Sequence, residues 1–204
     1  MTESDINKAL DSNNIDVKEN AIKDPNATES NINKALSDTN VYVRMNAIRN
    51  PNVSEVNINK ALNDENLIIR LTAIRNPKAS PNNINKALND EHSSIRLAAA
   101  NHPNANESNI NKALDDNDHT VRENAIKNLN ASPANINKAL NDDDIGVRWY
   151  AIHCKNATET NINKALDNDN IEIKLAAANH PNATEANKEK AYNDPDLIEY
   201  LLKH

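Results

Sequence analysis

The side chains of this sequence that could take part in catalysis or hold a metal ion are one cysteine and a few histidines. Cys154 directly follows His153, and two adjacent residues near the end of a helix point to different sides, so they make a poor Cys–His nucleophile pair. Of the five further histidines, His92, His102, His119 and His180 are spread over different parts of the chain. We therefore predict no catalytic residue, no metal site and no cofactor.

The composition narrows the function classes further. The chain has 204 residues and a formal net charge of −7, with one glycine and one cysteine. Gly146 alone cannot build the glycine-rich loops that hold nucleotide phosphates. Cys154 alone excludes an intrachain disulfide framework, which favours an intracellular protein. The sequence also shows no signal peptide, with its basic stretch followed by an apolar one, and no apolar run of roughly 18 residues that could span a membrane. We therefore expect a soluble, cytoplasmic protein with no membrane partner.

Asparagine dominates the polar composition. The chain has 41 asparagines, while aromatic residues make up only 2%. A large core with aromatic anchors cannot be assembled from this composition, so the core must be thin. The enrichment in Asn, Lys and Ile also favours an AT-rich gene, such as a phage gene, in which case the cytoplasm would be that of the host cell.

A repeat of 26 residues organises the whole chain, and such periodicity decides the class of fold. The string Ile-Asn-Lys-Ala-Leu recurs seven times at this spacing, and a degenerate copy begins at Lys188. With Thr2 as the first residue of the first copy, the repeats begin at residues 2, 28, 54, 80, 106, 132, 158 and 184, and the last is shortened. Since nothing is inserted between copies, we predict one repeat domain over residues 1–204.

Each copy carries the signals of two short helices. The first helix is expected to follow a Thr, Ser or Asn, such as Thr28, whose side chain accepts hydrogen bonds from N–H groups of the first turn. Ile32, Ala35 and Leu36 then form one apolar stripe. In two copies a proline, such as Pro81, follows the cap, where its fixed φ suits the start of a helix.

The second helix is expected from Val41 to about Arg49, with Val43 and Ala47 on its buried side. It should end at Asn50, because a proline follows and disfavours helical geometry in the residue before it. Helices commonly end with a glycine in the left-handed conformation, and asparagine also tolerates that conformation. We therefore predict that asparagine replaces the missing glycine at this position.

Helices this short are marginal on their own, so stacking of neighbouring copies must stabilise them. The sequence thus predicts an all-α fold, a solenoid of eight two-helix repeats whose last member is truncated and caps the stack. Residues 43–54 and 69–77 resemble the variant leucine-rich repeat and its HEAT-like relatives, and the resemblance extends from Thr2 to Tyr192. It implies a right-handed solenoid in which one helix of each pair tends to be a 3₁₀-helix. It also implies a binding scaffold, the usual role of such solenoids.

Most basic residues recur at fixed positions of the repeat. One such column lies in the second helix: Lys18, Arg44, Arg70, Arg96, Arg122, Arg148 and Lys174. We interpret it as a structural ladder with acidic residues of the turns, Asp38, Asp64, Asp90, Asp116 and Asp142; the alternative is a stripe that reads anions. The asparagines beside the invariant isoleucine, such as Asn31 and Asn33, are expected to cap helices or bridge adjacent copies.

Variation between copies concentrates on the second helix. The varying positions carry large apolar, aromatic and basic residues, the types enriched at binding hot spots. The candidate partner-binding residues are Tyr42, Met45, Arg49, Ile68, Leu71, Arg75, Leu97, Lys127, Trp149, Tyr150 and His153. Two interpretations are open: these residues form a partner surface on the concave side of the solenoid, or the apolar ones belong to the core between repeats.

The sequence therefore favours a non-catalytic scaffold that binds a protein or peptide, with an acidic segment as the favoured partner. The alternative is a nucleic-acid-binding protein in which Arg49, Arg75 and Lys127 track phosphates and Trp149 stacks on a base. A third reading, a HEAT-like enzyme that attaches a bilin chromophore, rests on fold analogy alone. The C-terminal stripe of Leu197, Ile198, Leu201 and Leu202 either caps a monomer or seals a homodimer.

Overall fold

The computed structural model describes residues 1–203 and contains sixteen α-helices, with no strand in that range. The chain divides into two compact units: unit 1 comprises residues 1–104, and unit 2 begins at residue 105. Unit 1 contains α1 (Glu3–Leu10), α2 (Ile15–Ile22), α3 (Glu29–Ala35), α4 (Val41–Arg49), α5 (Glu55–Ala61), α6 (Leu67–Ile74), α7 (Pro81–Ala87) and α8 (Ser93–Ala100). Unit 2 contains α9 (Glu107–Ala113), α10 (His119–Lys127), α11 (Pro133–Ala139), α12 (Ile145–Ile152), α13 (Glu159–Leu166), α14 (Ile171–Ala178), α15 (Glu185–Tyr192) and α16 (Pro195–Lys203).

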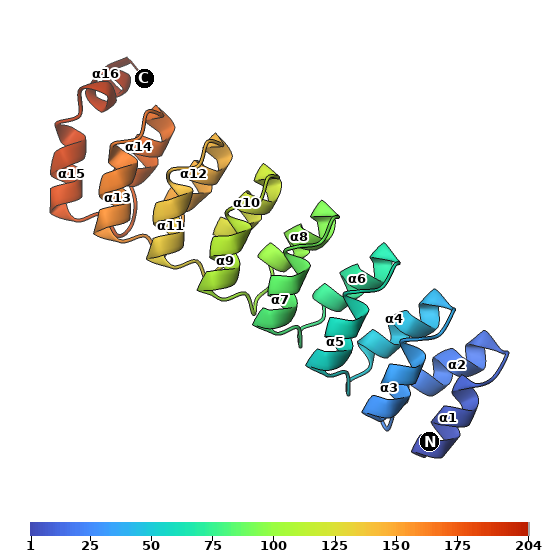
Figure 1. Ribbon diagram of the computed structural model, residues 1–204. Coiled ribbons are helices and arrows are strands. Elements are labelled where there is room, and N and C mark those ends of the chain that lie inside the picture. Colours follow the sequence, from blue (N-terminus) through green and yellow to red (C-terminus); the bar gives the residue numbers. More distant parts are fainter. Residues whose placement is uncertain (204) are drawn as a thin grey trace. The chain divides into compact units, whose positions relative to one another are not determined.

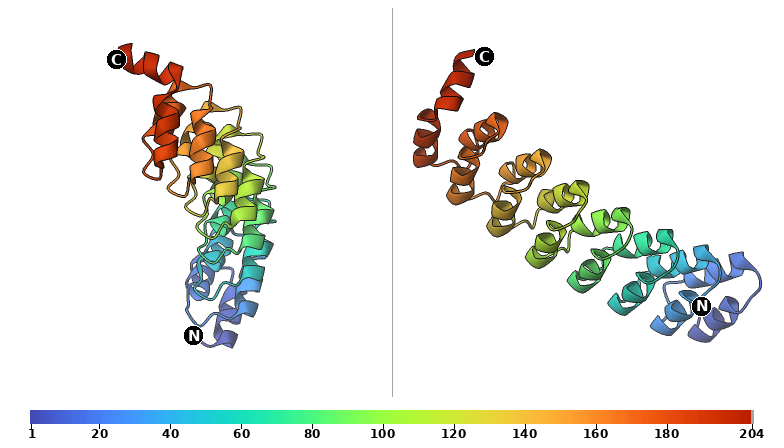
Figure 2. Two further views of the ribbon diagram at one scale, coloured as in Figure 1. Left: turned by 90° about the vertical axis from the view of Figure 1, so that its left-hand side faces the viewer. Right: turned by 45° about the horizontal axis from the view of Figure 1, so that its top comes forward.

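Each unit is built from two rows of helices (Figures 1 and 2). In unit 1, α1, α3, α5 and α7 pack in sequence along one row, and α2, α4, α6 and α8 pack along the other. Unit 2 repeats this arrangement, with α9, α11, α13 and α15 in one row and α10, α12, α14 and α16 in the other. The first and second helices of each repeat also contact each other. The predicted all-α solenoid fold is therefore confirmed.

The first helix of every repeat begins where the sequence predicts. Its N-cap side chain accepts a hydrogen bond from the backbone N–H three residues later, and the side chain at that position bonds back to the N-cap backbone. This capping box is present at Thr2, Thr28, Ser54, Ser80, Asn106, Ser132, Thr158 and Thr184. Such caps stabilise a helix start by about 1 kcal/mol each, which matters for helices of only two turns.

The core is the thin apolar layer between the two rows. In the second repeat Ile32, Val43, Ala47 and Ile48 have no exposed surface, and most of their equivalents in both units are buried as well; Val17 in the first repeat is an exception, at 41% exposed. Both helices of each pair are α-helices, so the implied 3₁₀-helix is absent from residues 1–203. Hydrogen bonds to the third preceding residue occur at the helix ends, as where Ser37 N–H donates to the Lys34 carbonyl at 3.0 Å after the first helix and Asn50 N–H to the Ala47 carbonyl at 3.3 Å after the second.

Asparagine side chains join successive repeats, which explains their abundance. Asn57 shows the pattern: its Oδ1 accepts from the backbone N–H of Ser54 at 2.9 Å, while its Nδ2 donates to Oδ1 of Asn33 in the preceding repeat at 3.0 Å. Lys60 adds a bond from Nζ to the Asn33 backbone carbonyl at 3.0 Å. An amide can accept through its oxygen and donate through its nitrogen at the same time. The prediction that these asparagines cap helices or bridge copies is confirmed, and Asn57 does both.

The cationic column of the second helix also joins repeats, as predicted. Arg44 donates from Nε and Nη2 to both carboxylate oxygens of Asp64, at 2.8 and 3.1 Å, and from Nη1 to the carbonyls of Asp38 and Thr39 in the turn of its own repeat. The same ladder contains the pairs Lys18–Asp38, Arg70–Asp90, Arg122–Asp142 and Lys174–Asp194. These cations are occupied by structural partners, which argues against a stripe that reads anions.

One member of this ladder lacks its acid. Asn168 stands where the pattern requires an aspartate for Arg148, and Nε of Arg148 is a buried polar atom without a hydrogen-bond partner. The guanidinium keeps its bond to the Asp142 carbonyl at 2.8 Å and lies 3.6 Å from Asp169.

The predicted conformation of Asn50 is wrong. No residue in the described range has a positive φ, and Asn50 is extended, with φ −62° and ψ 137°. Pro51 disfavours the helical region for Asn50 and leaves the extended one. The side chain of Asn50 then donates to the carbonyls of Ile22 and Asp24 at 2.7 and 3.1 Å. Asparagine is placed here for its amide, which bridges two repeats, and a glycine would lack that bond.

Candidate functional site

The candidate binding residues on the second helices are accessible to solvent. Tyr42 and Ile68 are each 57% exposed and Trp149 is 39% exposed. Met45, Leu71, Leu97 and Tyr150 are half-buried, and the four remaining candidates, Arg49, Arg75, Lys127 and His153, are exposed. None of the eleven is fully buried, but Met45, Leu71 and Leu97 keep only part of their surface accessible, so for these three both interpretations stay predictions. The even-numbered helices therefore present a surface whose residues differ from repeat to repeat.

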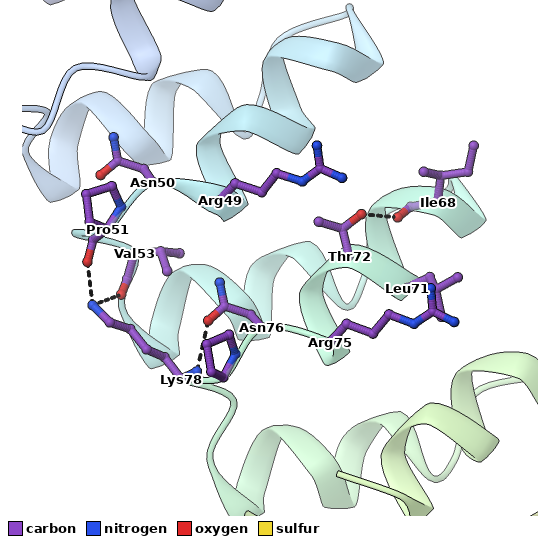
Figure 3. A pocket seen from close by; sticks show the side chains of 11 residues that line it. Arg49, Asn50, Pro51, Val53, Ile68, Leu71, Thr72, Arg75, Asn76 and Lys78 are labelled. Atoms are coloured by element: carbon purple, nitrogen blue, oxygen red, sulfur yellow. Dashed lines mark hydrogen bonds between the residues drawn. The ribbon is translucent and has the colours of Figure 1, made fainter. Parts of the chain in front are cut away.

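Four of these candidates meet in a pocket of about 480 Å³ in unit 1, lined by the last residue of α4, by α6 and by the connectors that follow both helices (Figure 3). They are Arg49, Ile68, Leu71 and Arg75. The long side chains of Arg49 and Arg75 extend to the same side in Figure 3, with Leu71 next to Arg75. The remaining lining comes from Thr72 and from the connectors that follow the two helices, Asn50, Pro51, Val53, Asn76, Pro77 and Lys78.

All charged side chains that line this pocket are cationic. Neither Arg49 nor Arg75 forms an ion pair or hydrogen bond through its guanidinium within residues 1–203, in contrast to the ladder arginines. Lys78 is engaged, since its Nζ donates to the backbone carbonyls of Pro51 and Val53. The lining contains these three cations and no carboxylate, although the whole chain carries a formal charge of −7. The pocket thus offers two unpaired guanidinium groups beside an apolar surface.

A second group of candidates meets in unit 2, on α10 and α12. The rings of Trp149 and His153 are stacked, with centroids 3.9 Å apart, and Trp149 meets Tyr150 edge to face at 5.1 Å. Nζ of Lys127 lies 3.6 Å above the Tyr150 ring and 3.2 Å from Oε2 of Glu123. Lys127, Tyr150 and His153 also line a pocket of about 320 Å³, together with residues of the connectors.

Gly146 has a role in this group. A Cβ atom at Gly146 would lie 2.5 Å from Oε1 of Glu123, so the only glycine of the chain leaves room for the carboxylate that holds Lys127. These contacts form a packed set of side chains around Tyr150.

Cys154 and His153 do not interact as a nucleophile and base. The Cys154 thiol donates to the carbonyls of Ile126 and Tyr150 at 3.2 and 3.4 Å, and burial raises its pKa to about 11. Nδ1 of His153 instead bonds to the backbone carbonyl of Trp149 at 2.7 Å. A thiol with a raised pKa is mostly protonated at neutral pH and is a poor nucleophile.

Two further absences concern the described residues. Within residues 1–203, no three His, Cys, Asp or Glu side chains are grouped so that they could hold a metal ion. The helices found there are also too short or too polar to cross a membrane.

Four candidates lie outside both pockets, and the C-terminal stripe is mostly exposed. Tyr42, Met45, Leu97 and Trp149 do not line either pocket. In α16, Leu197 is buried, whereas Ile198 is 43% and Leu202 is 83% exposed. The oligomeric state therefore stays a prediction.

Comparison with solved structures gives the fold a precedent. The chain is similar to a leucine-rich repeat variant with a novel repetitive protein structural motif, with a TM-score of 0.64 and 17% sequence identity over 88% of this chain and 71% of that one. The protein has the leucine-rich repeat variant fold. No family model and no curated protein sequence matches the chain. The leucine-rich repeat variant fold predicted from residues 43–54 and 69–77 is thus confirmed, and at this identity the similarity concerns the fold alone.

Sequence reasoning missed the part of the pockets that the connectors form. The connector after the second helix recurs with small changes from repeat to repeat, so its pattern indicates only the end of a helix and does not single out Lys78, Leu129 or Lys155. In the leucine-rich repeat variant fold each connector lies beside the C-terminus of a second helix. A search for cationic or apolar residues within about one turn after each second helix would have included Lys78, Leu129 and Lys155.

Proposed function

We propose that the protein is a non-catalytic interaction scaffold that binds an acidic, linear segment of a protein partner through the surface of its second helices. The observation that carries this proposal is the pocket of Arg49 and Arg75, which is lined by three cations and no carboxylate in a chain of net negative charge. The free thiol of Cys154 fits a reducing compartment, and we include the cytoplasm in the proposal.

The chemistry of the pocket supports a carboxylate ligand. A guanidinium binds a carboxylate through two parallel hydrogen bonds, and an arginine without an internal partner is free to do so. Ile68 and Leu71 place apolar surface beside the two arginines, as in hot spots where a buried apolar contact is combined with arginine. A peptide with acidic residues flanking an apolar one satisfies both parts of the lining.

The spacing of the helices supports an extended peptide. Neighbouring packed helices lie about 8–10 Å apart. In a peptide with the polyproline II conformation, which has three residues per turn and a rise of about 3.1 Å per residue, residues i and i+3 lie on the same face about 9 Å apart. A peptide that runs from α4 to α6 would therefore place residues i and i+3 near Arg49 and Arg75. We expect acidic residues at these two positions.

A single-stranded nucleic acid is the alternative ligand, because the exposed Trp149 could stack on a base beside Lys127. Binding to a phosphate backbone needs an extended basic surface. The ladder cations are already paired with aspartates, so few cations remain for phosphates. The peptide is favoured for this reason.

The test is a selection from a display library of random 12-residue peptides on the full chain, followed by fluorescence anisotropy with an enriched peptide. We expect enrichment of Asp or Glu at two positions three residues apart. The double variant Arg49→Glu/Arg75→Glu should weaken binding at least about tenfold. The matched control is Lys188→Glu/Lys203→Glu, which changes the charge equally on exposed residues of α15 and α16 and should bind as the native chain does.

Two outcomes would contradict the proposal. One is an enriched set without acidic residues, or one that binds the Arg49→Glu/Arg75→Glu variant unchanged. The other is tighter, steeply salt-dependent binding of a 20-nucleotide single-stranded DNA, which would establish the nucleic-acid alternative instead.

A further inference from the structure

The pockets of the two units are equivalent in sequence register. Moving the pocket of Arg49 and Arg75 by 78 residues, three repeats, brings Arg49 onto Lys127 and Arg75 onto His153. Nine of the lining positions coincide under this shift, which is the complete lining of the unit 2 pocket. The nine are Lys127, Asn128, Leu129, Ala131, Tyr150, His153, Cys154, Lys155 and Asn156. The 26-residue period by itself does not require that two such pockets lie three repeats apart.

The backbone around the two pockets follows the same three-repeat period. Two second helices, α4 and α10, have nine residues and end in an extended asparagine, at φ −62° and ψ 137° for Asn50 and φ −62° and ψ 130° for Asn128. Their partners in the pockets, α6 and α12, have eight residues and end in a helical C-cap, Arg75 or His153. The two pockets are therefore built on the same local frame.

A buried histidine supports each pocket from the following repeat. Nε2 of His102 bonds to the carbonyl oxygen of Asn76 at 3.1 Å, and Nε2 of His180 bonds to that of Cys154 at 3.2 Å. Asn76 and Cys154 are equivalent lining residues. The two histidines belong to an identical nine-residue string, at residues 97–105 and 175–183. Pocket and support thus recur together as a module of three repeats.

The charge of the lining is also retained. The unit 2 pocket contains Lys127, Lys155 and His153 and again no carboxylate. Lys155 forms no ion pair through its side chain in the described range. Nζ of Lys127 forms an ion pair with Glu123 and also lies over the Tyr150 ring. Its fixed position keeps one cation at the place that Arg49 has in unit 1.

The character of the walls differs between the pockets. Tyr150 stands in place of Thr72, and Leu129, which is 75% exposed, stands in place of Pro51. The Trp149 ring stacks on His153 at the edge of the lining. The unit 2 pocket thus offers more aromatic and apolar contact and fewer free guanidinium groups than the unit 1 pocket, and it fits an acidic segment whose neighbouring residue is large and apolar.

We propose that the pocket of Lys127, Tyr150 and His153 is a second peptide-binding site, so that the chain binds two acidic segments, one in each unit. This proposal rests on the proposed function, because it assigns the same class of ligand to the equivalent place in unit 2. It adds that the binding stoichiometry is two, and that the second site prefers an acidic segment with a large apolar residue.

Trp149 makes the second site observable by itself, since it is the only tryptophan of the chain and lies on α12 beside that pocket. The probe is one 12-residue peptide from the selection that contains two acidic residues and a leucine or phenylalanine. Calorimetric titration of the full chain should give two peptides per chain, and the tryptophan fluorescence should change during the titration.

Variants of each pocket separate the two sites. Arg49→Glu/Arg75→Glu should reduce the stoichiometry to one and keep the fluorescence change. Leu129→Glu/Lys155→Glu alters two exposed side chains, which spares the fold; it should reduce the stoichiometry to one and abolish the fluorescence change. The control Lys188→Glu/Lys203→Glu should keep both.

The results that would overturn this inference differ from those that would overturn the proposed function. A stoichiometry of one that is lost completely in Arg49→Glu/Arg75→Glu, with unchanged tryptophan fluorescence, would refute the second site and leave the proposed function intact. Two bound peptides in Leu129→Glu/Lys155→Glu would also refute it. If no acidic peptide binds the native chain at all, both proposals are wrong.

Discussion

His180 donates a hydrogen bond from Nε2 to the backbone carbonyl of Cys154 in the preceding repeat. Its Nδ1 accepts from the backbone N–H of Asn182 at 3.0 Å. These two partners define the neutral tautomer, because a protonated Nδ1 would face an N–H donor. His102 has the same arrangement with Asn76 and Asn104. The histidine ring thus donates to a carbonyl of the preceding repeat and accepts from the N–H two residues later, as the Asn50 amide does in its repeat. Unlike an amide, the ring can also bind a proton.

Acidification should therefore weaken the fold through these two histidines. Burial lowers the pKa of both His102 and His180. A group whose pKa is lower in the folded state binds protons preferentially in the unfolded state. The stability it provides is thus complete above about pH 6.5, the usual pKa of an unfolded histidine, and falls as the pH drops below that value. The urea midpoint, measured by circular dichroism between pH 7.5 and 5, should decrease in this window.

The double variant His102→Asn/His180→Asn is the control for this pH dependence, since Asn50 and Asn76 already serve at equivalent positions. It should keep a urea midpoint close to that of the native chain at pH 7.5 and lose most of the decrease between pH 6.5 and 5. An equally steep decrease in the variant would assign the effect to other groups.

Replacing Asn168 with aspartate should stabilise the protein. The variant Asn168→Asp supplies the carboxylate that the ladder lacks and gives Nε of Arg148 a partner. The gain in the free energy of unfolding is expected to be about 1 kcal/mol, the typical net value of such a hydrogen bond. Thermal and urea unfolding measure it. Asn13→Asp, at an exposed turn position, adds the same charge and should change stability by less than about 0.5 kcal/mol.

The same substitution should lower the stability much more at Arg70 than at Arg75, five positions further along the chain. Arg70→Met removes a guanidinium whose pKa is raised by its hydrogen bonds to Asp90 and leaves that carboxylate without its partner. We expect a loss of about 1.5–3 kcal/mol of stability. Arg75→Met removes an exposed, unpaired side chain and should change stability by less than about 0.5 kcal/mol while weakening peptide binding. Equal losses of stability in the two variants would contradict the distinction between ladder and pocket arginines.

Two substitutions of Asn57 should separate the two hydrogen bonds of its amide, one to the start of its own helix and one to the preceding repeat. Asn57→Asp retains the oxygen that caps α5, as Asp5 does for α1, but loses the donor that reaches Asn33. Asn57→Ala loses both the cap and the bridge. We expect a decrease of about 1 kcal/mol for the first variant and about 2 kcal/mol for the second. Chemical denaturation measures both, and a neutral effect of Asn57→Asp would mean that the bridge contributes nothing.

The local structure could be predicted because its causes lie close together in the sequence. Thr28 and Asn31 are three residues apart, and together they define the start of α3. Ile32, Ala35 and Leu36 follow helical spacing, so their burial was also predictable. The pairing of Arg44 with Asp64 was predictable from the repeat itself, because a cation and an acid that recur in every copy must meet between copies.

Asn50 shows where such reasoning ended. Its side-chain type permits a left-handed cap, and only the carbonyls of Ile22 and Asp24, a whole repeat away in the chain, make the extended conformation with a bridging amide the better solution. The same limit applies to the pockets, since Lys78 and Leu129 look like connector residues until the stacking places them beside the second helices.

The amino-acid sequence by itself determined the repeat, the helix boundaries, the buried stripe and the ladder, because each depends on interactions within one copy or between identical copies. Only the tertiary structure decided which variable residues share a pocket, that Arg49 and Arg75 remain unpaired while Arg70 does not, and that two similar pockets, each supported by a buried histidine, lie three repeats apart. The physical reason is that these properties arise from side chains of different copies brought together by packing, where distance, burial and the available partners decide the outcome.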